Sequence, residues 1–163
     1  MRSLIATTLM MITSVTASAA TVEVRPNRPV AQFTIPDDWK TSHIERGIQA
    51  VSKDKEVYFW IETYKPDQFQ DIVAEHSAYW KDQGVEITSR DEAKHEENGW
   101  EIVLTTEHAT WKGEPTVLYY VEYHLGLPSN SNIVMTYWAS PEGDKTFHDE
   151  IGDVLNSLKV TEK

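Results

Sequence analysis

The dipeptide Asn98-Gly99 lies between two long runs, 85–97 and 100–112, that contain no glycine or proline. Asn-Gly is the preferred sequence of a two-residue type I′ turn, whose twist matches that of the strands it joins. The two runs are therefore predicted to pair as a hairpin. Two further strand-like runs follow, at 116–125 and 132–139. This half of the chain predicts a stretch of consecutive antiparallel strands.

The first half of the chain predicts shorter strands. Residues 33–35 form a short strand before a proline turn, and residues 47–52 pair with residues 56–64. The strand at 56–64 is apolar on both faces. That composition is typical of a central strand that is covered on both sides.

Two segments have helical periodicity. Asp67 is predicted to cap the first helix with Gln70 as its reciprocal partner, and Gly84 to end it. Its apolar stripe consists of Phe69, Ile72, Val73, His76 and Trp80. A histidine on such a stripe is more often a core residue with one hydrogen bond than a ligand. The second helix is predicted over about 144–159, with Phe147, Ile151, Val154, Leu155 and Leu158 on one face.

The order of these elements is strands, a helix, antiparallel strands and a second helix. It predicts an α+β fold, an antiparallel sheet of six to seven strands in a meander with two main helices packed on it. No repeat, long linker or low-complexity tract interrupts the chain. Residues 21–163 are therefore predicted to form a single domain.

Two stretches resemble the PsbP-like sandwich family, which includes the photosystem II extrinsic protein, a Ran-binding nuclear import factor and DcrB-type bacterial envelope proteins. Phe33-Thr-Ile-Pro-Asp-Asp-Trp39 is similar to the family's opening F-x-(I/L)-P-x-x-W strand and turn. The segment from Phe147 to Lys159 resembles its closing helix. The resemblance implies a partner-binding or accessory protein rather than an enzyme. It assigns no functional residues, and the absence of an N-terminal cysteine departs from the lipoprotein members.

The first twenty residues have the composition of a secretory signal peptide. Arg2 gives a positive start, an apolar and threonine-rich run follows, and Ala17-Ser18-Ala19 is an A-x-A cleavage signal. Residues 1–20 are predicted to be removed after Ala19 or Ala20. The apolar run is too short for a membrane span, so no stable membrane insertion is expected. The predicted location is the periplasm, with secretion as the second choice.

The chain contains no cysteine and has a net charge of −11. Disulfides are therefore excluded, and the fold depends on its core. The negative charge repels nucleic acid and anionic lipid. It favours a basic partner or cations, although it can equally serve solubility alone.

The turns also predict which residues face each other. The first turn places Arg90 opposite Glu107. For the second, a two-residue loop (Gly113-Glu114) and a four-residue loop (112–115) give the same pairing, and Pro115 favours the longer loop because it lacks an N–H. The predicted pairs across the second hairpin are Val103 with His124, Thr105 with Glu122, and Glu107 with Tyr120. One face then carries charges of both signs, and the more apolar opposite face is expected to meet the core.

Glu107, Tyr120, Glu122 and His124 fall on the charged face. The commoner interpretation is a partly solvated face, in which Arg90 offsets the charge of Glu107. The alternative is a binding site, because two carboxylates roughly 7–8 Å apart and an imidazole could hold a divalent cation or act as acid and base. No H-E-x-x-H or similar spacing predicts a dedicated metal site. Neither a metal nor a cofactor is expected.

Glu62 lies between Trp60 and Tyr64 in the predicted central strand. Aromatic residues in strands are more often core, but a cleft of aromatic rings beside Glu62 would suit a sugar, a cation or a peptide. The rings available on strands are those of Tyr58, Trp60, Tyr64, Trp111, Tyr120 and Trp138. If Glu62 were buried without a partner, its pKa should rise, which would mark a functional site. The candidate ligand-binding residues are therefore Glu62, Glu107, Glu122, His124, Tyr120 and Trp60.

The sequence has no G-x-S-x-G motif, no cysteine nucleophile and no glycine-rich phosphate loop. No catalytic residues are predicted, and the protein is not expected to be an enzyme. The predicted function is a soluble periplasmic protein that binds a protein partner or an envelope component in an accessory or inhibitor role. The alternative is a protein that binds a small ligand or a divalent cation through strand carboxylates and an aromatic cleft.

Overall fold

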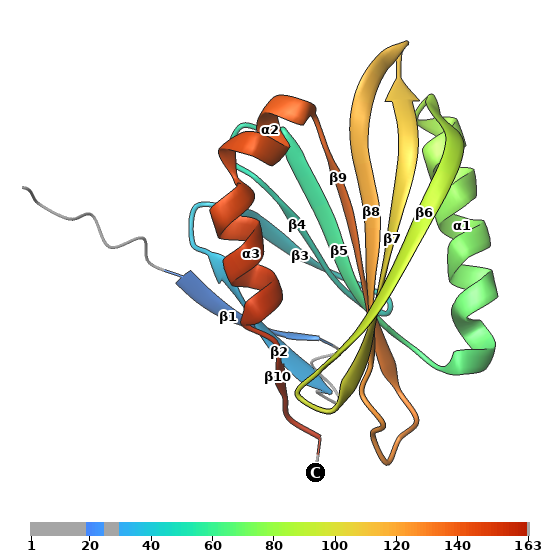
Figure 1. Ribbon diagram of the computed structural model, residues 1–163. Helices are drawn as coiled ribbons and strands as arrows, with labels where there is room; N and C mark the ends of the chain where they lie inside the picture. Colours follow the sequence, from blue (N-terminus) through green and yellow to red (C-terminus); the bar gives the residue numbers. More distant parts are fainter. Residues whose placement is uncertain (1–18, 25–29, 163) are drawn as a thin grey trace, which may run out of the picture.

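The computed structural model describes residues 19–24 and 30–162 (Figure 1). The predicted signal peptide lies outside these residues, except that Ala19 and Ala20 begin strand β1. Within the described residues, no helix is long and apolar enough to cross a membrane.

Seven antiparallel strands form the main sheet in the order β3-β4-β5-β9-β8-β7-β6. They are β3 (Lys40–Ile44), β4 (Gly47–Val51), β5 (Val57–Tyr64), β6 (Val85–Glu97), β7 (Trp100–Trp111), β8 (Glu114–His124) and β9 (Asn132–Ala139). Helix α1 (Phe69–Asp82) carries the chain from β5, inside the sheet, to the edge strand β6. The chain then returns strand by strand until β9 pairs with β5. The α+β class with an antiparallel sheet is confirmed, and so is the internal position of β5.

A second sheet of three short strands was not anticipated from the sequence. Its order is β1 (Ala19–Val24), β2 (Ala31–Pro36) and β10 (Lys159–Val160). Val24 of β1 and Ala31, Phe33 and Ile35 of β2 are fully buried in the main hydrophobic core, and Val22 packs against it. The main sheet is therefore covered on this side by strands as well as by helices.

The final helix was predicted as one piece over about 144–159, and this prediction is wrong. The structure has two helices, α2 (Pro141–Thr146) and α3 (His148–Asn156), which are separated at Phe147. Ser140 accepts a hydrogen bond from the backbone of Gly143, which starts α2 early. Ser157 ends α3 and accepts a bond from the backbone N–H of Thr34 in β2, at 2.8 Å. That contact directs the chain into β10 instead of a further helical turn.

Helix α1 begins differently from the predicted capping box. A short 3₁₀ helix, η1 (Pro66–Gln68), precedes it, and the side chain of Gln68 rather than Gln70 reaches back to the backbone N–H of Lys65. The predicted end is confirmed, because Gly84 has a φ of 79° directly after the helix.

The two faces of the main sheet are covered by different elements (Figure 1). One face packs against α2, α3 and the small sheet around the larger apolar core, with Phe33, Phe59, Met135, Tyr137 and Ile151 among its members. The other face packs against α1, which buries Ile72, His76 and Trp80. Because side chains alternate along a strand, inner strands such as β5 and β9 contribute to both layers.

Candidate binding sites

The pairing predicted for the first hairpin is confirmed from the Asn98-Gly99 turn to the pair Arg90–Glu107. Beyond that pair, a β-bulge interrupts the ladder between Ile87 and Ser89. Asn98 and Gly99 both have positive φ, as a type I′ turn requires.

The pairing predicted for the second hairpin is wrong by two residues. Its turn is Lys112-Gly113, with φ of 53° and 84°, so that Trp111 pairs with Glu114. Pro115 therefore lies inside strand β8 and is not needed to close the turn. The observed pairs are Glu107 with Leu118, Thr105 with Tyr120, Val103 with Glu122, and Glu101 with His124. A shift of two leaves every side chain on its predicted face.

The shift separates the two carboxylates that were expected to be diagonal neighbours. Glu107 lies opposite Leu118, four positions from Glu122 along β8. At the rise of a β-strand this is roughly 13 Å, so Glu107 and Glu122 do not form one cation site. Among residues 19–24 and 30–162, no three acidic or histidine side chains are grouped as metal ligands would be.

The charged face of the sheet is partly solvated, as expected, because Arg90, Glu92 and Lys94 on β6 are exposed. Its carboxylates on the inner strands are buried instead, with Glu62, Glu107 and Glu122 only 2%, 5% and 7% exposed on the side where α1 packs. The sequence did not reveal this because the covering residues are distant along the chain. The structure thus holds three carboxylates between a helix and a sheet, and each has different partners.

Glu122 is joined to two neighbours on its face. It accepts a hydrogen bond from the Tyr64 hydroxyl at 2.9 Å, and its Oε2 lies 3.6 Å from His124 Nε2. The other ring nitrogen of His124 lies 2.7 Å from the exposed Glu101. Burial raises the pKa of the Glu122 carboxyl, which the bond from Tyr64 and the charge of His124 only partly offset. Glu122 and His124 are brought together as predicted.

Glu107 is the least well satisfied of the three carboxylates. Its Oε1 lies 3.3 Å from the guanidinium of Arg90, which is itself mostly exposed. Its Oε2 is buried with no hydrogen-bond partner in the structure. Burial raises the pKa of the Glu107 carboxyl, and the charges of Arg90 and His108 offset only part of that effect.

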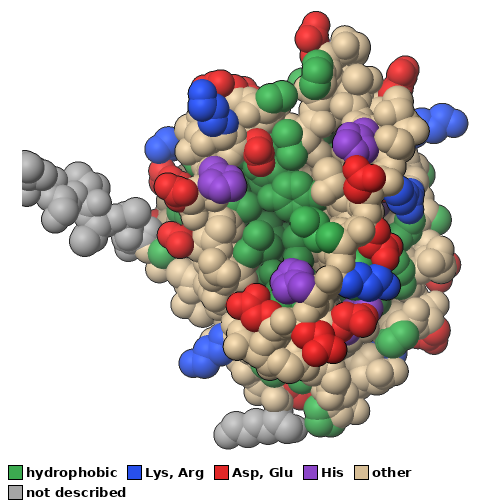
Figure 2. All heavy atoms as spheres, viewed as in Figure 1, with side chains coloured by type: hydrophobic (Ala, Val, Ile, Leu, Met, Phe, Trp, Pro, Cys, Tyr) green, Lys and Arg blue, Asp and Glu red, His purple; other side chains and the backbone are tan. Residues whose placement is uncertain are grey.

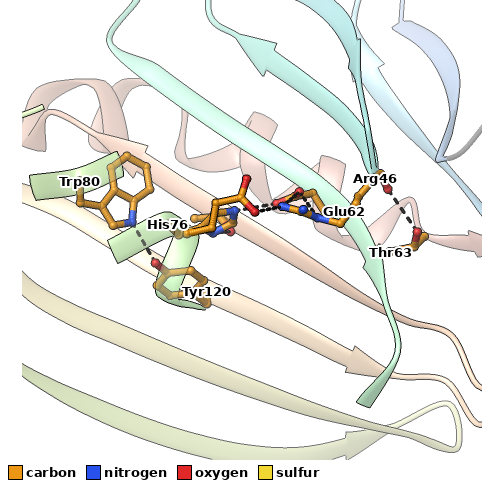
Figure 3. Close-up of polar contacts among 8 residues, drawn as sticks. Arg46, Glu62, Thr63, His76, Trp80 and Tyr120 are labelled. Carbon is orange, nitrogen blue, oxygen red and sulfur yellow. Dashed lines mark hydrogen bonds and ion pairs between the residues drawn. The ribbon is translucent and has the colours of Figure 1, made fainter. Parts of the chain in front are cut away.

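Glu62 is buried with two strong partners (Figure 3). Arg46 Nε donates to Glu62 Oε1 at 2.9 Å, and His76 Nε2 lies 2.8 Å from Glu62 Oε2. The Nδ1 atom of His76 meets the hydroxyl of Thr136 at 3.2 Å. Burial acts to raise the pKa of the Glu62 carboxyl, but His76 and Arg46 together hold it below its ordinary value. The sequence predicted a raised pKa only if Glu62 were buried without a partner, and Glu62 has partners.

Arg46 and Glu75 were not found by the sequence reasoning. Arg46 bridges Glu62 and Glu75 at 2.9 Å each. Its position depends on Gly47, which pairs with Glu62 across β4 and β5. A Cβ at Gly47 would lie 1.9 Å from the carbonyl oxygen of Ile61, so only glycine allows this close approach. Arg46 lies in the turn between β3 and β4. A prediction of the β4–β5 register from the sequence would have placed this turn beside Glu62.

An aromatic cleft lies beside Glu62, as the sequence suggested. Its volume is about 200 Å³, and it lies between α1 and the turn that joins β3 to β4. Its lining residues are Ile44, Glu45, Arg46, Trp60, Glu62, Glu75, His76, Tyr79 and Trp80. Of the predicted ligand-binding residues, Trp60 and Glu62 line this cleft. Tyr120 lies behind it and accepts a hydrogen bond from the indole of Trp80 at 2.9 Å, while Glu107, Glu122 and His124 do not line it.

The cleft is continuous with a larger network of rings. Trp60 packs edge-on against Tyr79 and Trp80, Trp80 contacts Trp138, and Trp138 contacts Tyr58 and Trp111. Four of the six rings proposed from the sequence therefore lie together. Tyr64 and Tyr120 belong instead to a separate apolar cluster under α1.

A second concavity lies on the opposite face of the sheet, between α3 and the strands β6, β7 and β8, and we call it the trough. Its volume is about 480 Å³. The lining residues are His95, Glu97, Asn98, Trp100, Ile102, Leu104, Thr106, Tyr119, Val121, Tyr123, Leu155, Asn156 and Leu158. Figure 2 shows hydrophobic side chains gathered in this hollow, with acidic and histidine side chains around it. The sequence predicted that this face meets the core, because it is the more apolar of the two.

Comparison with known proteins identifies the fold. No family model and no curated protein sequence matches the chain. Among solved structures, it is similar to PsbP of the cyanobacterium Synechocystis sp. PCC 6803, with a TM-score of 0.60 and 10% identity over 94% of this chain and 98% of that chain. The protein PA94 of Pseudomonas aeruginosa, of unknown function, gives a TM-score of 0.42 and 14% identity over 89% of this chain and 99% of that chain. The fold is PsbP-like, as the opening and closing motifs implied, and at this identity the likeness concerns the fold alone.

Proposed function

We propose that the protein is an exported, non-enzymatic binding protein that accepts an apolar, basic segment of a protein partner in the trough. The observation that carries the proposal is the trough itself, about 480 Å³ of open, largely apolar concavity on a folded surface. Open apolar surface of this kind on a soluble domain marks a binding site more often than chance exposure.

The shape of the trough suits a peptide segment. Its floor consists of side chains from β7 and β8, and one wall is formed by Leu155 of α3 and by Leu158, which follows the helix. A groove between a helix and a sheet receives alternate or helically spaced apolar side chains of a bound segment. Trp100 and Tyr119, which line the trough, are residue types that carry much of the binding energy at protein interfaces.

The charge of the trough and of the whole chain indicates the sign of charge expected of the partner. The residues that line the trough include Glu97 but no lysine or arginine, and the chain as a whole has a net charge of −11. An anionic ligand such as a fatty acid would be repelled, whereas basic residues flanking an apolar segment would be attracted. Within the described part of the chain, the trough is lined by no buried carboxylate or imidazole, because His95 and Glu97 are both exposed to solvent, which supports binding rather than catalysis.

A pair of synthetic peptides tests the proposal. One alternates leucine with lysine, the other leucine with glutamate, and binding is followed by fluorescence anisotropy. We expect the lysine peptide to bind and the glutamate peptide not to bind. Leu104→Asp, on the floor of the trough, should weaken binding of the lysine peptide at least about tenfold, the size expected for a buried interface residue.

The matched control is Tyr79→Asp, which adds the same charge on the opposite side of the sheet, where Tyr79 is 40% exposed. Electrostatic attraction alone would make both aspartate variants bind the lysine peptide slightly more tightly. Equal effects of the two substitutions would therefore overturn the trough as the site. A photo-crosslinking residue in place of Trp100, with Trp111 as the control position, extends the test to partners in living cells.

Export is tested separately. Cleavage after Ala19 or Ala20 would leave a mature chain that begins at Ala20 or Thr21 and retains most of β1. Mass spectrometry of the protein from a periplasmic fraction should show one of these two termini. A chain that retains Met1 in the cytoplasmic fraction would contradict export and would leave the binding proposal intact.

A further inference from the structure

The aromatic cleft under α1 lies on the side of the sheet that the trough does not use. It combines three rings, those of Trp60, Tyr79 and Trp80, with four charged side chains. Trp60 and Tyr79 form its apolar wall, with ring centroids 5.6 Å apart in an edge-on arrangement. Tyr79 is 40% exposed, among the most exposed large apolar residues of the described chain. The ring face of an exposed aromatic residue is a flat apolar platform for a ligand.

The polar wall of the cleft is held in place before any ligand arrives. Arg46 is fixed by Glu62 and Glu75, at 2.9 Å each, and Glu62 in turn is fixed by His76 at 2.8 Å. Glu62 is 2% exposed and cannot move without breaking both contacts. A side chain whose position is already fixed loses little entropy when a ligand binds.

The mixture of donors and acceptors distinguishes among ligand classes. An anion would meet the carboxylates of Glu45, Glu62 and Glu75. An ammonium ion would have to compete with Arg46, whose guanidinium already occupies Glu62 and Glu75. A neutral polyhydroxylated ring avoids both conflicts, because its hydroxyls accept from Arg46 and donate to Glu75 or Glu45, while its C–H face packs against Trp60 or Tyr79.

The size of the cleft limits the ligand further. Sites for drug-sized molecules usually measure about 300–1,000 Å³, whereas this cleft measures about 200 Å³. One six-membered sugar ring is therefore the largest unit that it would enclose, and any longer chain would continue into solvent. From these observations we propose that the cleft formed by Arg46, Trp60, Glu75 and Tyr79 binds one neutral pyranose ring of a carbohydrate.

The test uses simple sugars and two competing ligand classes. Glucose, N-acetylglucosamine and the β-1,4-linked disaccharide of each are titrated into ¹⁵N-labelled protein, with tetramethylammonium and sulfate in parallel. Binding is read from the indole N–H signals in the two-dimensional NMR spectrum. We expect saturable shifts of the Trp60 and Trp80 signals with at least one sugar. The Trp100 signal, which comes from the trough on the other face, should stay unchanged.

Variants locate the site. Trp60→Ala should weaken sugar binding about tenfold or more, the size of one lost aromatic contact. The matched control Trp111→Ala removes a ring of the same network that does not line the cleft, and it should bind sugar normally. If Trp60→Ala does not fold, Tyr79→Ala serves instead, because Tyr79 is already 40% exposed.

Glu75→Gln separates a sugar site from a cation site. Glutamine keeps the hydrogen-bonding oxygen and removes the charge, so sugar affinity should change by less than about threefold. Saturable binding of tetramethylammonium that Glu75→Gln abolishes would replace the proposal with a cation site. The absence of any saturable shift with all four sugars would overturn it outright, and neither result would affect the trough.

Discussion

Glutamine in place of Glu62 is expected to destabilise the protein strongly at neutral pH. The carboxylate is 2% exposed and is contacted by Arg46 at 2.9 Å and by His76 at 2.8 Å. Hydrogen bonds to charged groups contribute about 1.5–3 kcal/mol each, and removal of one member of a buried pair costs about 3–5 kcal/mol. Glutamine keeps one acceptor, and Arg46 retains Glu75 and some contact with water. We therefore expect a loss of about 2–3 kcal/mol in the free energy of unfolding.

The pH dependence of that loss follows from the direction of the pKa shift. The pKa of Glu62 is lower in the folded protein than its ordinary value of 4.5. The stabilisation is therefore fully present above pH 4.5 and disappears as the pH falls through the folded-state pKa. The difference between wild type and Glu62→Gln should be largest at neutral pH and should shrink toward pH 3.

Glu107→Gln is the matched control, with the opposite expected sign. The pKa of Glu107 is raised by burial, so the folded state favours its protonated form. At pH 7 its buried carboxylate has one oxygen without a hydrogen-bond partner, and a neutral side chain removes the cost of burying that charge. The variant should be more stable than wild type by about 1 kcal/mol at pH 7. This gain should be lost below pH 4.5, where both states of the wild type are protonated.

Urea unfolding followed by tryptophan fluorescence, repeated from pH 3 to pH 7, measures both differences. Equal destabilisation by Glu62→Gln and Glu107→Gln would refute the reasoning, since it would mean that burial alone decides the effect. So would a Glu62→Gln difference that does not change with pH.

Three further substitutions test local features by thermal or urea unfolding. Gly47→Ala should cost more than about 2 kcal/mol, because its Cβ would lie 1.9 Å from the Ile61 carbonyl oxygen; a smaller loss would show that β4 can shift away from β5. Lys112→Asn should stabilise by about 0.5 kcal/mol, since asparagine tolerates the positive φ of 53° better than lysine does, and destabilisation would contradict the turn assignment. Ser140→Ala should cost about 1 kcal/mol, because the Ser140 hydroxyl caps Gly143 at 2.9 Å; no change would show that α2 does not depend on its cap.

Features set by local sequence were predictable. The Asn98-Gly99 turn fixes the β6–β7 register through adjacent residues, and the prediction holds as far as Arg90–Glu107. The second turn was misplaced because Lys112 adopts positive φ, a conformation that the sequence gives little reason to expect of lysine. The small sheet was missed because β10 has two residues and pairs with a strand more than a hundred residues earlier.

The candidate sites depended more on contacts between distant residues. Trp60 and Glu62 were identified because a polar residue in an apolar central strand is conspicuous in the sequence. The partners of Glu62 come from the β3–β4 turn and from α1, at Arg46 and His76, and no local pattern links those segments. The trough was not predicted from the sequence, because its apolar lining has the same pattern as a closed core.

The contrast between the two faces of the sheet explains how the cleft keeps its shape. Apolar contacts are non-directional, and they would tolerate small displacements of α1 along the sheet. A displacement by one helical turn, about 5.4 Å, would move His76 away from Glu62. The loss of this partner would cost much free energy, because the Glu62 carboxylate is buried. The ion pair therefore selects one position of α1 in addition to stabilising the fold. That position fixes Tyr79 opposite Trp60, so the polar layer under the helix determines the geometry of the aromatic cleft beside it.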